Sequence, residues 1–431
     1  MINPKFFKYK IESSIIILIP LLLIFSRFLL EISLLYLSIS YLIVLKKKKI
    51  YSFLINDFAY IFFGFYLILI FSYAFSEFKE DTFTIIFYFR YFIYISALTY
   101  FFQNDLYLIK SFFTVIAITI LILLVDSFLQ FFMGENIFGF KNQESHRITS
   151  FFDDEKILGS YSLKMLTLLI FAKLFISETS KKLQMLFNVS IISVPLLVFL
   201  SGERAALFAL VLMIFYFSFY LYKDKKFKIL YKSSIILFFL ILVFLINSKT
   251  YYDRYINSTV SSIFDANYSQ NKHQLPEEII SKYKFFFLSA QHQNYLSTSL
   301  NIYNQNKITG SGPKSFRYAC KDKKVNINVY SCGTHPHNYY FQLLSETGIV
   351  GFIYILLIYL YIIFKSFLNF KNLYLKKEYN FYEITILGYF FVQFWPINQT
   401  ANLFNNYNSI FMLIPLSIYM SLNIKKKDEI L

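Results

Sequence analysis

Long apolar blocks, separated by short polar stretches, constrain the fold of this chain more than any other feature. Each block has about 20 residues, the length with which an α-helix crosses the roughly 30 Å hydrocarbon core of a bilayer. Only 16% of the 431 residues are charged, against about 25% in an average soluble protein. The sequence therefore predicts an all-α polytopic membrane protein. We expect about twelve spans, at residues 11–27, 29–45, 53–75, 83–102, 107–130, 157–177, 185–201, 204–222, 231–247, 349–366, 381–397 and 409–424.

Clusters of basic residues indicate how these spans are oriented. The clusters lie at 46–49, 181–182, 223–228, 371–377 and 425–427, and alternation of the spans puts all of them on one side. The positive-inside rule makes that side cytoplasmic, so both termini are predicted to be cytoplasmic. The net charge of +16 is explained by this topology. No nucleic-acid-binding motif accompanies it, so no nucleic acid is expected as a partner.

Two long connections fall on the opposite, outer side, at residues 131–156 and 248–348. The chain then divides into spans one to nine over 1–247, a large outer loop over 248–348, and spans ten to twelve over 349–431. A loop of that length is expected to hold structure of its own. We predict a helix over about 276–304, a turn at Gly310 and Gly312, and a second helix over about 336–347 that ends at Gly348.

The only two cysteines, Cys320 and Cys332, both lie in the large outer loop. An oxidising compartment favours a disulfide between them. The bridge would close a loop of about a dozen residues and contribute on the order of 3 kcal/mol. Two free thiols are the alternative. Two cysteines without a second pair are a weak metal signal, so no metal site is predicted.

A histidine-containing segment lies at the outer mouth of the tenth span. There, His337 is followed by Asn338 and, further on, by Glu346. A neutral imidazole can accept a proton from a hydroxyl group near neutral pH, and the two polar neighbours can orient nearby groups. The residues alone leave an equal alternative, in which the histidine only binds lipid headgroups.

Several motifs resemble those of one bacterial family. Residues 337–351 read His-Asn, nine residues, then Gly348-x-x-Gly351, which resembles the signature of the O-antigen ligase and polymerase family. The Gly-x-Gly at 310–312, the Ser-x-x-Arg at 201–204, and residues 126–134, 147–152 and 159–161 resemble further motifs of that family. Together these matches cover about residues 120–365. Ser150 stands where the family often has glycine.

The resemblance implies a metal-independent glycosyltransferase of the bacterial inner membrane, with a periplasmic active face and no cofactor. Its donor would be a glycan on undecaprenyl diphosphate. The family's histidine, carried onto His337, would activate the acceptor hydroxyl, and the family's arginine, carried onto Arg204, would hold the diphosphate. Arginine suits that task because its guanidinium binds phosphate through a bidentate fork. An arginine that only extends to the membrane interface is the alternative for Arg204.

Other basic residues are further candidates. Arg147 and Arg317 lie in outer loops and can reach phosphate or glycan, with a solvated loop charge as the alternative for each. Arg90 lies within the fourth span, where a charged residue is a functional candidate. Pairing of Arg90 with Asp126 or Glu155 is an equal alternative.

The leading function is that of an O-antigen ligase, which transfers the glycan onto lipid A–core. The alternative is an O-antigen polymerase, which joins lipid-linked repeat units. A transporter would also fit twelve spans, but transporters usually show internal repeats and polar groups at the membrane midplane. Here no repeat is visible, and the polar motifs cluster at the outer face.

Overall fold

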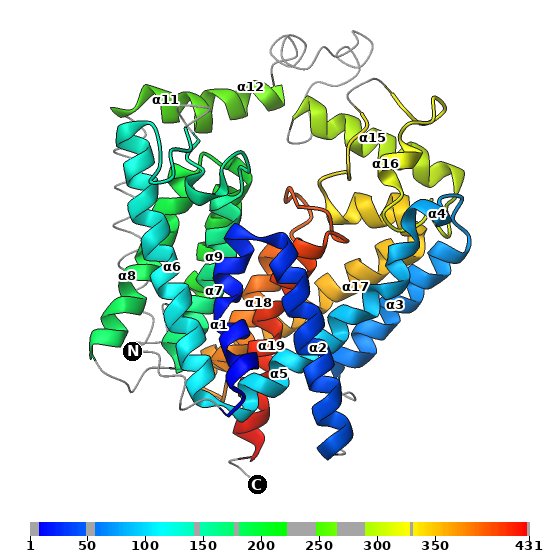
Figure 1. The fold of residues 1–431 in the computed structure, drawn as a ribbon. Helices are drawn as coiled ribbons and strands as arrows, with labels where there is room; N and C mark the ends of the chain where they lie inside the picture. Colours follow the sequence, from blue (N-terminus) through cyan, green and yellow to red (C-terminus); the bar gives the residue numbers. More distant parts are fainter. Residues whose placement is uncertain are drawn as a thin grey trace.

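The computed structural model describes residues 8–48, 57–141, 147–175, 181–221, 247–264, 289–327 and 331–428. These residues form helices and connecting loops, without a strand among them (Figure 1). Within these described ranges, seven helical segments are long and apolar enough to cross a membrane, which fits a polytopic membrane protein. They are α2 (Arg27–Lys48), α3 (Asp57–Ala74), the run Lys79–Asn104, α6 (Leu106–Met133), α7 (Leu158–Phe175), α8 (Lys181–Leu200) and α17 (Tyr339–Tyr374).

Four further helices occupy positions predicted as spans: α1 (Lys10–Phe25), α9 (Arg204–Leu221), α18 (Phe381–Gln393) and α19 (Asn406–Asp428). The predicted span at 231–247 lies almost wholly outside the described residues, so the number twelve stays a prediction. The predicted span at 83–102 is more irregular than expected. It consists of α4 (Lys79–Thr82), the 3₁₀ helix η3 (Phe83–Phe89) and α5 (Arg90–Asn104).

Short helices form a layer across one end of the bundle, at the top of Figure 1. They are α11 (Lys249–Tyr252), the π-helical turn η6 (Asp253–Asn257), α12 (Ser258–Phe264), α15 (Ala290–Gln305) and α16 (Phe316–Ala319). All of them come from the region predicted as the large loop. The predicted helix at 276–304 appears as α15, capped by Ser289, and residues 276–288 lie outside the described ranges. The ends of α2 and α19 lie at the opposite end of the bundle.

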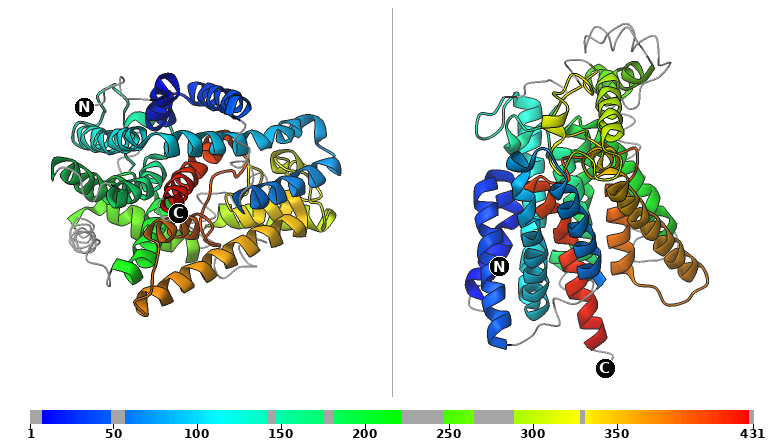
Figure 2. Two further views of the ribbon diagram at one scale, coloured as in Figure 1. Left: turned by 90° about the horizontal axis from the view of Figure 1, so that it is seen from below. Right: turned by 90° about the vertical axis from the view of Figure 1, so that its right-hand side faces the viewer.

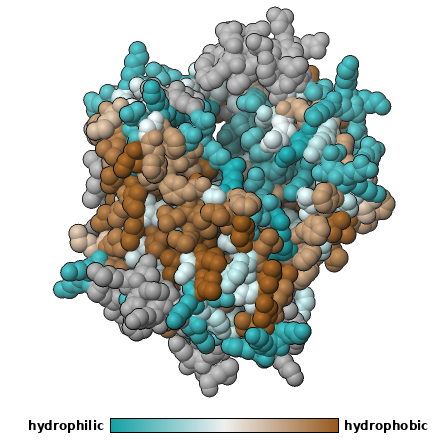
Figure 3. Space-filling view, viewed as in Figure 1, coloured by the Kyte–Doolittle hydropathy of each residue, from teal (hydrophilic) through white to brown (hydrophobic). Residues whose placement is uncertain are grey.

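The surface has a hydrophobic band between two hydrophilic ends (Figure 3). Exposed apolar side chains on α2 and α3 include Ile39 and Leu67. The helices α5 and α19 pack together inside the bundle, and α3 lies beside α17 (Figure 2). The upper end is hollowed between the pair α11–α12 and the pair α15–α16 (Figure 3). The hydrophobic band between two hydrophilic ends is the surface expected of helices that cross a bilayer.

A break in α17 shapes this end of the molecule. Gly348 has φ 67° and ψ −163°, so the helix stops and restarts there, close to where the sequence predicts a helix end. The loop 307–312 runs along the break. The two backbones are so close that a Cβ atom on Gly348 or Gly310 would collide with the opposite backbone. Three backbone hydrogen bonds of 2.9 Å join the two segments: Ile349 N to Lys307 O, Ser311 N to Ser345 O, and Gly312 N to Glu346 O.

We predict that Gly348→Ala destabilises the protein more than Gly139→Ala. Both glycines have a positive φ, 67° and 79°, so alanine costs about 1–2 kcal/mol of backbone strain at either site. Only at Gly348 does the new methyl group also meet backbone atoms, since nothing lies within 4 Å of a Cβ on Gly139. That collision should cost about 1–3 kcal/mol more. Thermal unfolding in detergent measures the difference, and equal losses for the two variants would contradict the packing of the break.

Candidate active site

Three histidines gather where α15 meets the head of α17. The ring centroid of His337 lies 4.0 Å from that of His335 and 5.8 Å from that of His292. Burial lowers the pKa of His337 below its ordinary value of 6.5. The ring is therefore neutral at pH 7 and can accept a proton. No hydrogen bond from a described residue engages its ring nitrogens.

His335 has a different role, because both of its ring nitrogens are engaged. Its Nε2 lies 3.2 Å from the carbonyl oxygen of Thr400, which can only accept. The proton of the neutral ring is thus on Nε2, and Nδ1 accepts from the Thr334 hydroxyl at 2.9 Å. Burial, then the neighbouring His337 ring, lowers the pKa of His335 to about 3. His335 supports the neighbouring ring rather than titrating near neutrality.

Asn338 fixes the head of α17. Its Oδ1 accepts from the backbone N–H groups of Tyr340 and Phe341, at 3.0 and 3.3 Å, and so caps the helix. Its Nδ2 donates to the carbonyl oxygen of Pro396 at 2.7 Å. The Thr400 N–H also donates to the carbonyl oxygen of His337 at 2.8 Å. The loop between α18 and α19 thereby holds the backbone that carries His337.

Glu346 links the start of α16 to α17. Its Oε1 accepts from the Phe316 N–H at 2.9 Å, and its Oε2 accepts from Gln342 Nε2 at 3.0 Å. The same Gln342 nitrogen donates to Asn402 Oδ1 at 2.9 Å. All three side chains of this network are buried, so breaking it would leave polar groups unsatisfied. The network sets the position of the residue after Phe316, which is Arg317.

Cys320 and Cys332 form a disulfide, with a Cα–Cα distance of 5.2 Å. This is the pairing that the sequence favours over two free thiols. Cys320 is fully buried in a small apolar cluster with Tyr295 and Phe316. The bridge joins the end of α16 to the segment that leads into His335.

Arg204, at the start of α9, contacts α12. Its Nη1 donates to the Ser258 carbonyl oxygen at 3.0 Å, to Ser262 Oγ at 3.1 Å and to Thr259 Oγ1 at 3.4 Å. Arg254 reinforces the attachment by donating from Nε to the Gly202 carbonyl oxygen at 3.0 Å. The structure therefore places Arg204 at the base of the upper layer. It shows no contact between Arg204 and His337 among the described residues.

Glu203 gathers the other motif segments. Its carboxylate accepts from the N–H groups of Gly159 and Ser160, at 2.6 and 3.3 Å. Burial raises the pKa of Glu203 to about 7, against the opposing effects of the Gly159 N–H and the Arg147 charge. Arg147 thus lies with Glu203 rather than with the histidines. A Cβ atom on Gly159 would collide with the Ser201 hydroxyl, which explains the glycine.

Asp126 and Ser150 brace the loop that follows α6. Ser150 has φ 52°, a conformation that favours glycine, which is the residue the family often has there. Its hydroxyl donates to Asp126, which also accepts from the Ile137 N–H at 3.0 Å. These bonds compensate for the strained backbone by holding it in place.

Both predicted partners of Arg90 are wrong. Its Nη2 lies 3.5 Å from Glu31 Oε2, and it also donates to the Tyr91 hydroxyl at 3.0 Å. Asp126 is engaged by Ser150, and Glu155 by Arg27. The pair could not be predicted from the sequence, because Glu31 and Arg90 lie far apart along the chain, on α2 and α5, and these helices come together only in the fold.

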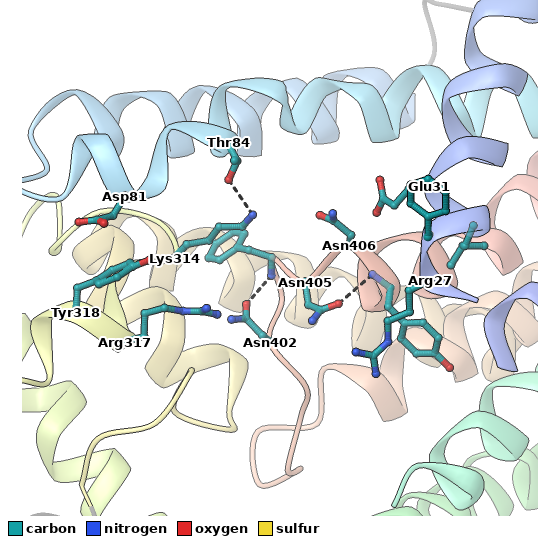
Figure 4. Close-up of a pocket in the computed structure, with 14 residues that line it drawn as sticks. Arg27, Glu31, Asp81, Thr84, Lys314, Arg317, Tyr318, Asn402, Asn405 and Asn406 are labelled. Atoms are coloured by element: carbon teal, nitrogen blue, oxygen red, sulfur yellow. Dashed lines mark hydrogen bonds between the residues drawn. The ribbon is translucent and has the colours of Figure 1, made fainter. Parts of the chain in front are cut away.

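A cavity of about 480 Å³ lies between the start of α2, which carries Glu31, and the segment that carries Arg317 (Figure 4). Of the arginines predicted to bind diphosphate, Arg317 lines it, whereas Arg204 and Arg147 do not. Arg27 and Lys314 also line it, and neither is among the residues predicted from the sequence. Lys314 could have been found from its place directly after the Gly-x-Gly motif. Arg27 gave a weaker signal, an arginine at the turn between two spans.

A comparison with protein families supports the resemblance. A family model described as O-antigen ligase matches residues 189–356. No curated protein matches the chain. The matched segment contains the turn with Arg204, the head of α17 with His337, and the break at Gly348. Over residues 189–356, which make up less than half of the chain, the protein is therefore similar to the O-antigen ligase family.

Proposed function

We propose that this protein is an O-antigen ligase. It would transfer a glycan from undecaprenyl diphosphate to a hydroxyl group of lipid A–core, at the periplasmic face of the inner membrane. The observation that carries the proposal is the His337 ring, which is neutral and partly buried at the head of α17. The family match supports glycosyltransferase-like chemistry in a membrane protein.

In the proposed reaction, His337 accepts the proton of the acceptor hydroxyl. The hydroxyl oxygen then attacks the anomeric carbon of the donor sugar and forms the new glycosidic bond. The bond between that carbon and the diphosphate oxygen breaks, and undecaprenyl diphosphate leaves with its charge increased. Guanidinium groups stabilise such a charge through paired hydrogen bonds. Arg204 is proposed for this role from its motif, with Arg147 as a second candidate on the same side.

Deleting the gene separates ligase from polymerase. A missing ligase leaves long glycan on the lipid carrier and bare lipid A–core, because the last transfer fails. A missing polymerase leaves core capped with a single repeat unit. Gel analysis of lipopolysaccharide together with extraction of carrier-linked glycan reads both products. Single-repeat caps would replace the ligase proposal with the polymerase alternative.

We predict that His337→Ala lowers the transfer rate by about 10²–10⁴-fold, the usual contribution of a general base. As pH falls, the wild-type rate should decline at a lower pH than an ordinary imidazole would give, because burial holds the pKa of His337 below its usual value of 6.5. The decline follows protonation of the ring. His292→Gln is the matched control, since it removes another imidazole of the cluster, whose Nδ1 is already held by Ser289 Oγ at 2.6 Å. Full activity of His337→Ala in purified, folded protein would remove the base from the mechanism.

For Arg204, we predict that Arg204→Lys reduces kcat/KM for the donor by about tenfold or more, because lysine lacks the fork. Ser262→Ala is the control. It removes one contact between Arg204 and α12 but keeps the guanidinium. If both variants change donor kinetics equally, Arg204 only fastens α12 and does not hold the diphosphate.

A further inference from the structure

Four parts of the chain line the cavity beside the histidines, and three of them contribute charged groups. The residues come from the start of α2, from α4 and η3, from 314–318, and from the loop that leads into α19. Figure 4 shows Arg317 and Lys314 extending into it from one side, opposite Arg27 and Glu31. Its volume of about 480 Å³ lies within the range of small-ligand sites, about 300–1,000 Å³.

Two of its cations have no carboxylate partner. Among the described residues, neither Lys314 nor Arg317 forms an ion pair, and the Lys314 ammonium donates to a neutral group, Thr84 Oγ1, at 3.1 Å. Of the other charges that line the cavity, Arg27 is bound to Glu155 and Glu31 lies 3.5 Å from Arg90, while Asp81 forms no ion pair among the described residues. The cavity therefore presents two unpaired cations against one unpaired carboxylate.

The nearby cations affect the pKa of the Lys314 ammonium group. Burial lowers the pKa of Lys314, and the positive charges of Arg90 and Arg317 lower it further, against the opposing charges of Glu346 and Glu31. Like charges gathered in a partly buried site repel one another unless an anion lies between them. The arrangement is fixed by the fold, because Glu346 holds the Phe316 N–H and Gly312 is bound to α17. The repulsion cannot be relieved by a simple rearrangement of that backbone.

The cavity lies at the end of a candidate membrane span, where lipid headgroups are expected. The membrane-spanning helix α2 begins at Arg27, which lines the cavity. Exposed aromatic side chains flank it on two elements: Phe28 of α2 is 73% exposed, and Phe83 and Phe87 of η3 are 52% and 51% exposed. Large apolar groups at this exposure fit contact with lipid. An anion reaching the cavity from the bilayer would thus be attached to a lipid.

We propose that this cavity binds the phosphate group of a membrane lipid through Lys314 and Arg317, with Arg27 at its edge. The inference rests on the proposed function for the identity of that lipid. A ligase has two lipid substrates with phosphate groups: the undecaprenyl diphosphate donor and the phosphorylated lipid A–core acceptor. The shared chemistry is a phosphate ester anchored in the bilayer.

The bound phosphate would lie on the histidine side of the upper layer. The charge of Arg317 acts on His335, whose ring lies 4.0 Å from that of His337. Arg204 and Arg147 instead lie with α12 and Glu203. The cavity is accordingly a second anion site, separate from the one proposed at Arg204, and it would deliver a lipid substrate to the imidazole cluster.

The test measures lipid binding to the full chain in nanodiscs by native mass spectrometry. The probes are undecaprenyl diphosphate, undecaprenol, lipid A and dephosphorylated lipid A. We expect at least one phosphorylated probe to bind more tightly than its phosphate-free counterpart. The double variant Lys314→Gln with Arg317→Gln should weaken that probe by about tenfold or more, since charge-assisted hydrogen bonds are lost. The weakened probe identifies the source: the diphosphate marks a donor site, and lipid A marks an acceptor site.

Two single variants sharpen the result. Lys324→Gln removes an exposed positive charge from the same segment and should leave binding unchanged. Asp81→Asn removes a negative charge from the cavity and should strengthen binding. If the double variant does not fold, Arg317→Gln replaces it, because that side chain is exposed and makes no hydrogen bond within the described residues. Unchanged binding of both phosphorylated probes in the folded variant would overturn the proposal.

This outcome is separable from the failure of the proposed function. If His337→Ala keeps full transfer activity while the cavity variants lose phosphate-dependent binding, the lipid site stands and the catalytic proposal fails. If His337→Ala is inactive and the cavity variants bind as the wild type does, the reverse holds.

Discussion

Backbone hydrogen bonds between residues 307–312 and the broken turn of α17 hold together the end of the molecule that carries the histidines. They exist only because glycine at 310 and at 348 lets two backbones approach without a side chain between them. From this contact, one direction along the chain leads to Lys314 and Arg317. The other leads back through the first turns of α17 to His337. A single close approach therefore sets the relative positions of the cationic cavity and the imidazole cluster.

Buried polar side chains complete that arrangement. Asn338 is hydrogen-bonded to the α18–α19 loop. The hydrogen-bonded network of Glu346, Gln342 and Asn402 joins α16, α17 and the same loop. Because water cannot replace these bonds in a buried site, each element is held at one distance from the others. The upper end of the bundle is thus rigid around His337. Arg204 belongs to a second rigid set, with α12 and the turn around Glu203.

The parts of the fold that depend on local pattern could be predicted from the sequence. Apolar length located most helices, and the glycine after Thr347 marked the break in α17. The parts that depend on distant contacts could not. The pairing of Arg90 with Glu31 joins residues on two helices whose packing no periodicity reveals. Arg27 and Lys314 share a cavity although 286 residues separate them in number, and only the packed bundle brings them together.

The N-terminal hairpin α1–α2 has a consequence for how this protein compares with its relatives. The family match begins at residue 189, yet Arg27, Phe28, Leu30 and Glu31 form one wall of the charged cavity. A wall supplied from outside the matched segment can change in sequence while the histidine-bearing helix stays the same. Under the proposed function, proteins that share the matched segment can then differ in the lipid that they admit while they keep the residues proposed for the transfer. A comparison of the matched segment alone would leave out the residues of this wall.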